Sequence, residues 1–185
     1  NYGYVHGGGN PWVNTMNRYS FATATENATD IGDLTRAKAA AGGLSSPIHG
    51  YACGGLYTPH TTEIERYPFA STVTSVLWDD LSSARAHCAT HSDGTYGFTS
   101  GGYVYSAPTH QNVIEKFPFA TASGVVDVGD LEWATRPAGC QSATYGFAAG
   151  GYSGGARLNV IERYSFTSDG NSADYADLTR SQDAC

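Results

Sequence analysis

The chain has 185 residues, about the size of one domain, and its 23 Gly and 13 Tyr stand beside a single Met. The formal net charge is −7 and no run of basic residues is present, which argues against nucleic acid as the main partner because phosphate binding needs clustered cations. No apolar run approaches the roughly 20 residues of a membrane-spanning helix. Few charges with many Gly, Ser, Thr and Tyr residues indicate a β-rich protein of an extracellular or particle-surface type.

A motif of an aromatic residue followed by glycine and a further strand-like run recurs four times. Its glycine falls 47, 47 and 49 residues apart, at Gly3, Gly50, Gly97 and Gly146. A fixed period near 40–50 residues with short strand-like runs is typical of a propeller or an array. We therefore predict one domain over 1–185, with repeats at approximately 1–48, 49–95, 96–144 and 145–185.

Each repeat is predicted to contain four strands. The first follows a basic residue and is rich in small residues, as in 85–91 and 136–143. The second ends in a glycine pair, which permits positive φ and close backbone approach. These pairs are Gly7–Gly8, Gly54–Gly55, Gly101–Gly102 and Gly150–Gly151.

The third and fourth strands have patterns of their own. The third alternates apolar and charged residues with period two, at 16–21, 64–69, 114–119 and 161–166. The fourth is short and carries an Asp-Leu pair at 33–34, 80–81, 130–131 and 177–178. An Ala-rich stretch at 36–41 would suit a helix, but the repeat register favours strand or loop.

The glycine pair, the Tyr-containing third run and the basic residue opening the next strand together resemble a kelch-type β-propeller blade. The resemblance covers all four repeats and implies an all-β fold, a β-propeller of kelch-like four-stranded blades. The outer-strand tryptophan of the kelch pattern is present only as Trp78, and a Ser/Pro-Phe run follows the tyrosine. The Pro-Phe-Ala and Val-Gly-Asp-Leu motifs are similar to those of kelch-like repeat proteins of marine phages and bacteria, and this resemblance implies a virion or cell-surface location.

The sequence is consistent with two interpretations of the number of blades. The chain begins at a second strand and stops in a first strand, so 180–185 would pair with 2–8 if four blades closed a ring. The ends supply fewer residues between the basic residue and the motif glycine than the internal repeats do. A closed four-blade ring and a part of a larger propeller are both consistent with the repeats.

The loops between second and third strands vary most, whereas the strand motifs repeat faithfully and therefore specify packing. Eight candidate binding residues lie in these loops: Trp12, Tyr57, His60, Tyr103, Tyr105, His110, Tyr152 and Arg157. Aromatic side chains give a large contact area at low entropy cost. One interpretation is a surface that recognises a protein or a glycan; the other is a cover over the ends of the blades.

The other residues that could bind a metal or react are expected to have structural roles. His87 and His91 would lie about 13 Å apart on one strand, too far to chelate a metal together. No CxxC pair is present, so we expect buried free thiols at Cys53, Cys88, Cys140 and Cys185. Strand-end hydrogen bonds are expected, rather than calcium, at Asp33, Asp80, Asp130 and Asp177. We expect no metal and no cofactor.

No nucleophile elbow, metalloprotease or P-loop motif is present. We therefore expect a non-catalytic structural or binding module. The kelch resemblance leaves open an enzyme, either a galactose-oxidase-like copper oxidase or a carbohydrate-active enzyme, although no residue matches the copper ligands of galactose oxidase. A third reading is a purely architectural subunit whose loops contact copies of the same chain.

Overall fold

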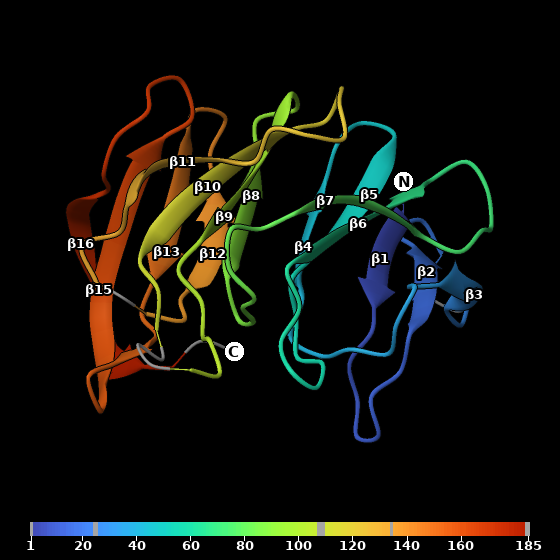
Figure 1. Ribbon diagram of the computed structural model, residues 1–185, viewed down its shortest axis with the longest axis horizontal. Coiled ribbons are helices and arrows are strands. Elements are labelled where there is room, and N and C mark those ends of the chain that lie inside the picture. Colours follow the sequence, from blue (N-terminus) through green and yellow to red (C-terminus); the bar gives the residue numbers. More distant parts are fainter. Residues whose placement is uncertain (1, 24–25, 107–109, 134, 184–185) are drawn as a thin grey trace.

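The computed structural model describes residues 2–23, 26–106, 110–133 and 135–183. Within these ranges the chain is all β, as predicted, and it forms four antiparallel sheets that follow one another along the long axis of the molecule (Figure 1). The Ala-rich stretch at 36–41 is loop rather than helix. Among the described residues there is no helix with the length and apolarity that a membrane crossing needs.

Sheet one has three strands, in the order β1 (Tyr2–His6), β2 (Thr15–Ser20) and β3 (Thr29–Asp33). Sheet two has four, in the order β4 (Gly42–Ser45), β5 (His49–Cys53), β6 (Glu63–Pro68) and β7 (Val76–Asp80).

Sheet three repeats this order with β8 (Ala89–Ser92), β9 (Tyr96–Ser100), β10 (Val113–Pro118) and β11 (Val126–Asp130). Sheet four contains β12 (Ala138–Gln141), β13 (Tyr145–Ala149), β15 (Ala156–Ser165) and β16 (Ala173–Gln182), with the short β14 (Tyr152–Ser153) paired to β15.

The first strands of sheets two, three and four are β4, β8 and β12, which we call the inner strands. They pack side by side, β4 on β8 and β8 on β12. Small residues are needed there because a Cβ at Gly139 of β12 would lie 3.0 Å from Ala89 and from His91 of β8. Of the two readings of the blade number, the closed ring would pair 180–185 with 2–8; among the described residues β16 runs to Gln182 and pairs with β15, and no pairing with β1 is present.

The repeated motif glycine lies beneath an aromatic ring of the neighbouring strand. Gly50 pairs with Tyr67, and Gly97 pairs with Phe117. A Cβ at either glycine would overlap the ring of its partner. Sheets one and four repeat the arrangement, with Gly3 under Tyr19 and Gly146 under Tyr164. The glycine and the aromatic residue of the two sequence motifs are therefore two halves of one contact.

The glycine pairs tie each sheet to the connection that follows it. The first glycine of each pair has φ between 62° and 64°, in the left-handed region that favours glycine. The second donates its N–H to a backbone carbonyl: Gly8 to Lys38 at 2.8 Å, Gly55 to Arg85 at 2.9 Å and Gly102 to Thr135 at 2.7 Å. Lys38, Arg85 and Thr135 thus occupy equivalent positions.

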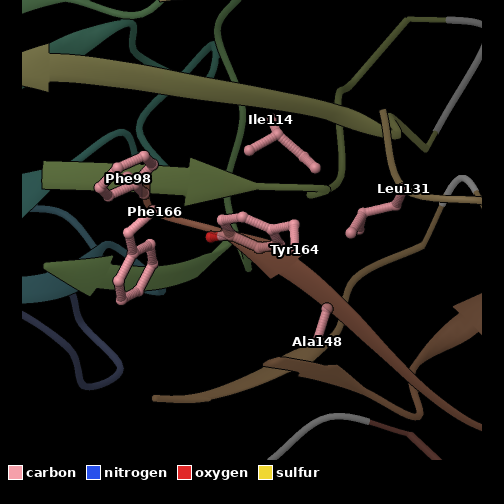
Figure 2. Close-up of a cluster of buried hydrophobic side chains, with 6 residues drawn as sticks. All are labelled: Phe98, Ile114, Leu131, Ala148, Tyr164 and Phe166. Carbon is pink, nitrogen blue, oxygen red and sulfur yellow. The ribbon is translucent and has the colours of Figure 1, made fainter. Parts of the chain in front are cut away.

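Apolar clusters join neighbouring sheets face to face. The cluster between sheets three and four, drawn in Figure 2, consists of Phe98, Ile114, Leu131, Ala148, Tyr164 and Phe166. The cluster between sheets two and three contains Tyr51, Cys53, Ile64, Leu81 and Phe117. The cluster between sheets one and two contains Met16, Ile31, Leu34, Ala52 and Tyr67. The leucines of the Asp-Leu pairs at 34, 81 and 131 are each at most 3% exposed, so they anchor these clusters.

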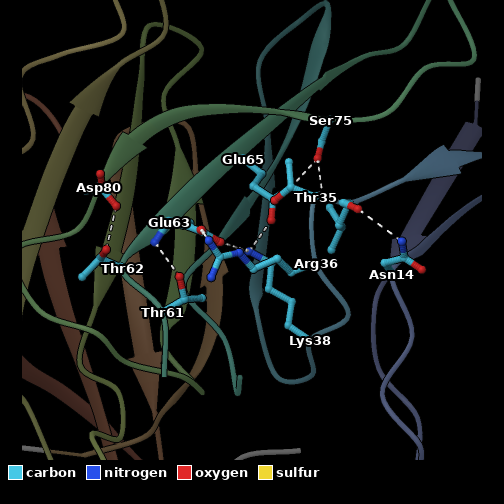
Figure 3. A network of polar contacts seen from close by, with 11 residues as sticks. Asn14, Thr35, Arg36, Lys38, Thr61, Thr62, Glu63, Glu65, Ser75 and Asp80 are labelled. Carbon is cyan, nitrogen blue, oxygen red and sulfur yellow. Dashed lines mark hydrogen bonds and ion pairs between the residues drawn. The ribbon is translucent and has the colours of Figure 1, made fainter. Parts of the chain in front are cut away.

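A buried carboxylate lies on the third strand of sheets two, three and four. Figure 3 shows Glu65 of β6 with the Lys38 ammonium 2.6 Å away, and the Ser75 hydroxyl and the Thr35 N–H also donate to it. In sheet three Arg85 pairs with Glu115 in the same way. In sheet four Thr135 replaces the cation, and among the described residues no ion pair involves Glu162.

The cysteine prediction holds only in part. Cys53 and Cys88 are buried free thiols, as expected. Cys140 is also a free thiol, but it is exposed, as are all the residues of β12. Cys185 lies outside the described residues.

Candidate binding site at the loop end of the sheets

The variable loops gather at one end of the sheets. In each antiparallel sheet the second strand ends at its glycine pair, and the fourth strand returns to that same end before the chain crosses to the next sheet. The hairpins between first and second strands lie at the opposite end. Loops from three sheets can therefore contribute side chains to one surface.

Five of the eight candidate residues form a continuous row of aromatic and imidazole rings, which we call the ring row. Its centroid distances are 6.1 Å for Tyr105–His60, 5.4 Å for His60–Tyr103, 5.6 Å for Tyr103–His110 and 5.9 Å for His110–Tyr152. His60 belongs to sheet two, Tyr103, Tyr105 and His110 to sheet three, and Tyr152 to sheet four. The row thus crosses two boundaries between sheets.

His60 lies at the buried part of the row. It is 8% exposed, and neither ring nitrogen has a hydrogen-bond partner among the described residues. Burial lowers the pKa of His60, so its imidazole is neutral at pH 7 and offers one donor and one acceptor. Tyr105 beside it is 79% exposed, so its ring can move aside without breaking a packed core.

His87 lies at an exposed position in the connection between sheets two and three. The sequence prediction placed it on one strand with His91, but β8 begins only at Ala89 and His87 has φ 56° in a turn. Partial burial lowers the pKa of His87, and the charges of Arg136 and His60 lower it further while Asp183 raises it. His87 is therefore within electrostatic range of the row.

Arg136 and Asp183 complete the site beside Tyr152. The guanidinium donates from Nε at 3.0 Å and from Nη2 at 2.5 Å to the two oxygens of Asp183, and it lies 5.3 Å from the ring centroid of Tyr152. Burial is the main cause that lowers the pKa of His110, the Arg136 charge adds to it and Asp183 opposes it. The cation is thus held by a carboxylate, and the surface around the row has little net charge.

Sequence reasoning missed His87, Arg136 and Asp183 as members of this site. One signal was available for Arg136: it follows Arg85 by 51 residues, whereas Lys38 and Arg85 are 47 residues apart, so it cannot occupy the place of the buried cations and lies one position beyond their equivalent, Thr135. Asp183 has no counterpart in the other repeats, so no pattern pointed to it.

Three candidate residues lie outside the row. Trp12, in sheet one, is 39% exposed, and Tyr57 is covered by the Arg36 guanidinium at 5.3 Å from its ring centroid. Arg157 was predicted in a loop, but it lies in β15 opposite Tyr152. The reason is that β15 has ten residues and begins at Ala156, well before the Ile-Glu-Arg-Tyr motif.

Three of the four aspartates of the Asp-Leu pairs lie at the end of a strand, and the fourth lies inside one. Asp33, Asp80 and Asp130 end β3, β7 and β11, and the Asp80 carboxylate accepts a hydrogen bond from the Thr62 hydroxyl at 2.6 Å. Asp177 lies inside the longer β16. Within the part of the chain that the structure describes, no three His, Cys, Asp or Glu side chains are grouped so as to hold a metal ion.

The fold has counterparts among solved structures. No protein-family model matches the chain, and no curated protein matches it. A solved structure entitled "Structure of YjhT" superposes on 95% of this chain with a TM-score of 0.80 and 12% sequence identity. The chain spans 62% of the length of YjhT. At this level of identity the likeness establishes a shared fold and nothing about ligands.

Proposed function

We propose that this chain is a non-catalytic binding module whose ring row, with Arg136 and Asp183, recognises a neutral glycan. The observation that carries the proposal is the row itself: rings from three sheets meet in one line at the end where the loops vary. Tyrosine and histidine offer flat contact area and polar groups together, the combination that suits a sugar ring with its C–H faces and hydroxyls.

The charges of the site favour a neutral ligand over an anionic one. Lowered pKa values leave His60, His87 and His110 neutral at pH 7. Arg136 is engaged by Asp183 in a two-point ion pair. A phosphate or acidic ligand would need unengaged cations. A hydroxyl can instead both donate to and accept from the neutral imidazole of His60, whose nitrogens lack partners among the described residues.

We further propose that the four sheets are blades of a kelch-type propeller, and that the inner strands face its axis. Support comes from the side-by-side packing of β4, β8 and β12, from the glycine pairs that fasten each sheet to the next connection, and from the fold shared with YjhT. The similarity of the repeats to phage proteins is the ground for placing this module on a virion or cell surface.

A glycan array probed with the purified protein tests the proposed ligand class. We expect binding to uncharged oligosaccharides, reduced roughly tenfold by Tyr105→Ala, which removes a stacking ring, and by His60→Phe, which keeps the ring but removes its nitrogens. The matched control is Tyr96→Ala, since Tyr96 starts β9 at the opposite end of sheet three. Binding confined to anionic glycans, or unchanged in both site variants, would refute the proposal.

A further inference from the structure

Two kinds of side chain alternate along the ring row. In order the row consists of Tyr105, His60, Tyr103, His110 and Tyr152, so each imidazole lies between two tyrosines. The steps between ring centroids are nearly equal, from 5.4 to 6.1 Å. An alternating row with an even step matches a ligand that itself repeats, because each unit of the ligand can present the same groups to the next ring.

A single sugar is too small to use the whole row. A pyranose ring is about as wide as a phenol ring, so one sugar covers one ring and leaves the others without contact. The row is also open, since Tyr105 is 79% exposed and Tyr103, His110 and Tyr152 are partly exposed. The hollow between the inner strands, with a volume of about 380 Å³, includes His87 but no ring of the row. These features favour contacts along a chain of sugars over the enclosure of one terminal sugar.

The rings of the row do not form a flat platform. Neighbouring rings are inclined to each other by 44° to 67°, so no two of them share a plane. The surface is also uneven, because Tyr105 is 79% exposed whereas the adjacent His60 is 8% exposed. A crystalline polysaccharide presents a flat face, and coplanar rings are needed to stack on it. The tilted rings instead fit a separate chain whose sugars turn against each other at each linkage.

His60 places a hydrogen-bonding group between two stacking rings. Its centroid lies 6.1 Å from that of Tyr105 and 5.4 Å from that of Tyr103, and neither of its nitrogens has a partner among the described residues. A neutral imidazole offers one donor and one acceptor, and a buried polar group without a partner costs free energy. A sugar hydroxyl that reaches His60 removes this cost. The sugar that supplies it lies between the two tyrosines, within a chain that continues on either side.

We infer that the ring row binds one chain of a linear, neutral oligosaccharide along its length, with about one sugar against each ring. This inference rests on the proposed function and names the form of its ligand. The tyrosines stack on the C–H faces of the sugars, and the imidazole of His60 exchanges hydrogen bonds with their hydroxyls. Recognition of a lone terminal sugar and adsorption to a crystalline face are the two alternatives that the inference excludes.

Titration calorimetry with neutral oligosaccharides of increasing length tests the inference. The probes are the cello-, malto-, manno- and N-acetylchito-oligosaccharides, each from the single sugar to the hexamer. In a series that binds, the affinity should rise several-fold with each added sugar and should level off at about five sugars, one for each ring of the row. The protein should not be retained on crystalline cellulose or crystalline chitin.

Removal of either end of the row should shorten the ligand that the protein distinguishes. Tyr105→Ala and Tyr152→Ala should each lower the affinity for the hexamer roughly tenfold and leave the affinity for the dimer nearly unchanged, because a dimer can still bind to the remaining rings. Tyr105 is largely exposed, so its variant should retain the fold. The matched control is Tyr96→Ala, at the opposite end of sheet three, which should keep the length dependence of the wild type.

Three results would overturn the inference and leave the proposed function intact. Equal affinity for the single sugar and the hexamer would show that a terminal sugar is recognised. Retention on crystalline cellulose or chitin would show that the row accepts a flat face. An effect of only one of the two end variants, at every length, would confine the ligand to that end. A protein that binds no neutral glycan of the array would instead refute the proposed function itself.

Discussion

At the scale of single residues, His91 is the side chain that most directly joins two sheets. It belongs to β8 and is 1% exposed, yet it contacts the Tyr164 hydroxyl at 2.6 Å and the carbonyl of Phe147 at 3.0 Å, both in sheet four. Burial lowers its pKa to about 4, while the carbonyls of Phe147 and Cys140 oppose the shift. The neutral imidazole is therefore part of the folded structure, and protonation would disrupt it.

The pKa of His91 predicts an acid-sensitive stability. Because the folded pKa of about 4 lies below the unfolded value of 6.5, the contribution is complete above pH 6.5 and is lost as the pH falls toward 4. The free energy of unfolding should drop by about 3 kcal/mol between pH 7 and pH 4 from this group, since tenfold in proton affinity corresponds to about 1.4 kcal/mol. Urea unfolding at a series of pH values measures the slope.

The matched control for this prediction is the double variant His91→Leu with Tyr164→Phe. It reproduces the apolar contact that Leu44 makes with the Phe117 cluster between sheets two and three. The double variant should unfold with a flatter pH dependence over the same range. An unchanged slope in that variant would assign the acid sensitivity to other groups.

At the scale of the elements, the third strands carry a buried carboxylate whose partner differs between sheets. Burial raises the pKa of Glu65, but hydrogen bonds from Lys38 and Ser75 outweigh it, and the net pKa is lowered. Burial also raises the pKa of Glu162, and hydrogen bonds from the Ser172 hydroxyl and the Glu132 backbone N–H only partly offset it, so the net pKa is raised. At neutral pH the charged carboxylate at this strand position is therefore favourable for folding in sheet two and unfavourable in sheet four.

Glutamine at these two positions should have opposite effects at pH 7. Glu65→Gln removes the nearer of the two carboxylates that pair with the buried Lys38, leaving Glu63 at 3.7 Å, and should lower the free energy of unfolding by up to about 3 kcal/mol. Glu162→Gln keeps one acceptor oxygen for the Ser172 hydroxyl and the Glu132 N–H and removes a buried charge that has no ion pair among the described residues, so it should give a smaller increase. Chemical unfolding of both variants beside the wild type measures the difference.

The pH dependence provides the control for this pair. The penalty from Glu162 appears as the pH rises through its raised pKa, so wild type and Glu162→Gln should converge in acid. The contribution of Glu65 is present above its unfolded pKa and disappears as the pH falls through its lowered folded pKa. Loss of stability in both variants at pH 7 would contradict the assignment.

At the scale of the whole molecule, the sequence predicted the sheets well and the site poorly, for physical reasons. The motif glycines and the aromatic residues above them repeat because each pair is a close contact within one sheet, so both halves leave a pattern at fixed spacing. The buried Lys38 was not recognised, although it precedes Arg85 by the repeat step of 47 residues, because Arg36 shares its residue type with Arg85 and Arg136.

The members of the ring row could be predicted from the sequence as loop residues, but the contacts between them could not. His60, Tyr103 and Tyr152 come from three loops, and their distances depend on how the sheets pack on one another. No spacing along the chain contains that information. Arg136 precedes the first strand of sheet four and Asp183 follows its last strand, so their ion pair also depends on how the strands pack and not on spacing along the chain.

The proposed function requires that the loop end of the sheets is the binding surface. Hydrogen exchange with and without the best-bound oligosaccharide tests this claim directly. We predict slower exchange in the segments around His60, His87, His110 and Tyr152, with no change in the hairpins at 46–48, 93–95 and 142–144 of the opposite end. Protection of those hairpins, with the ring row unaffected, would contradict the account.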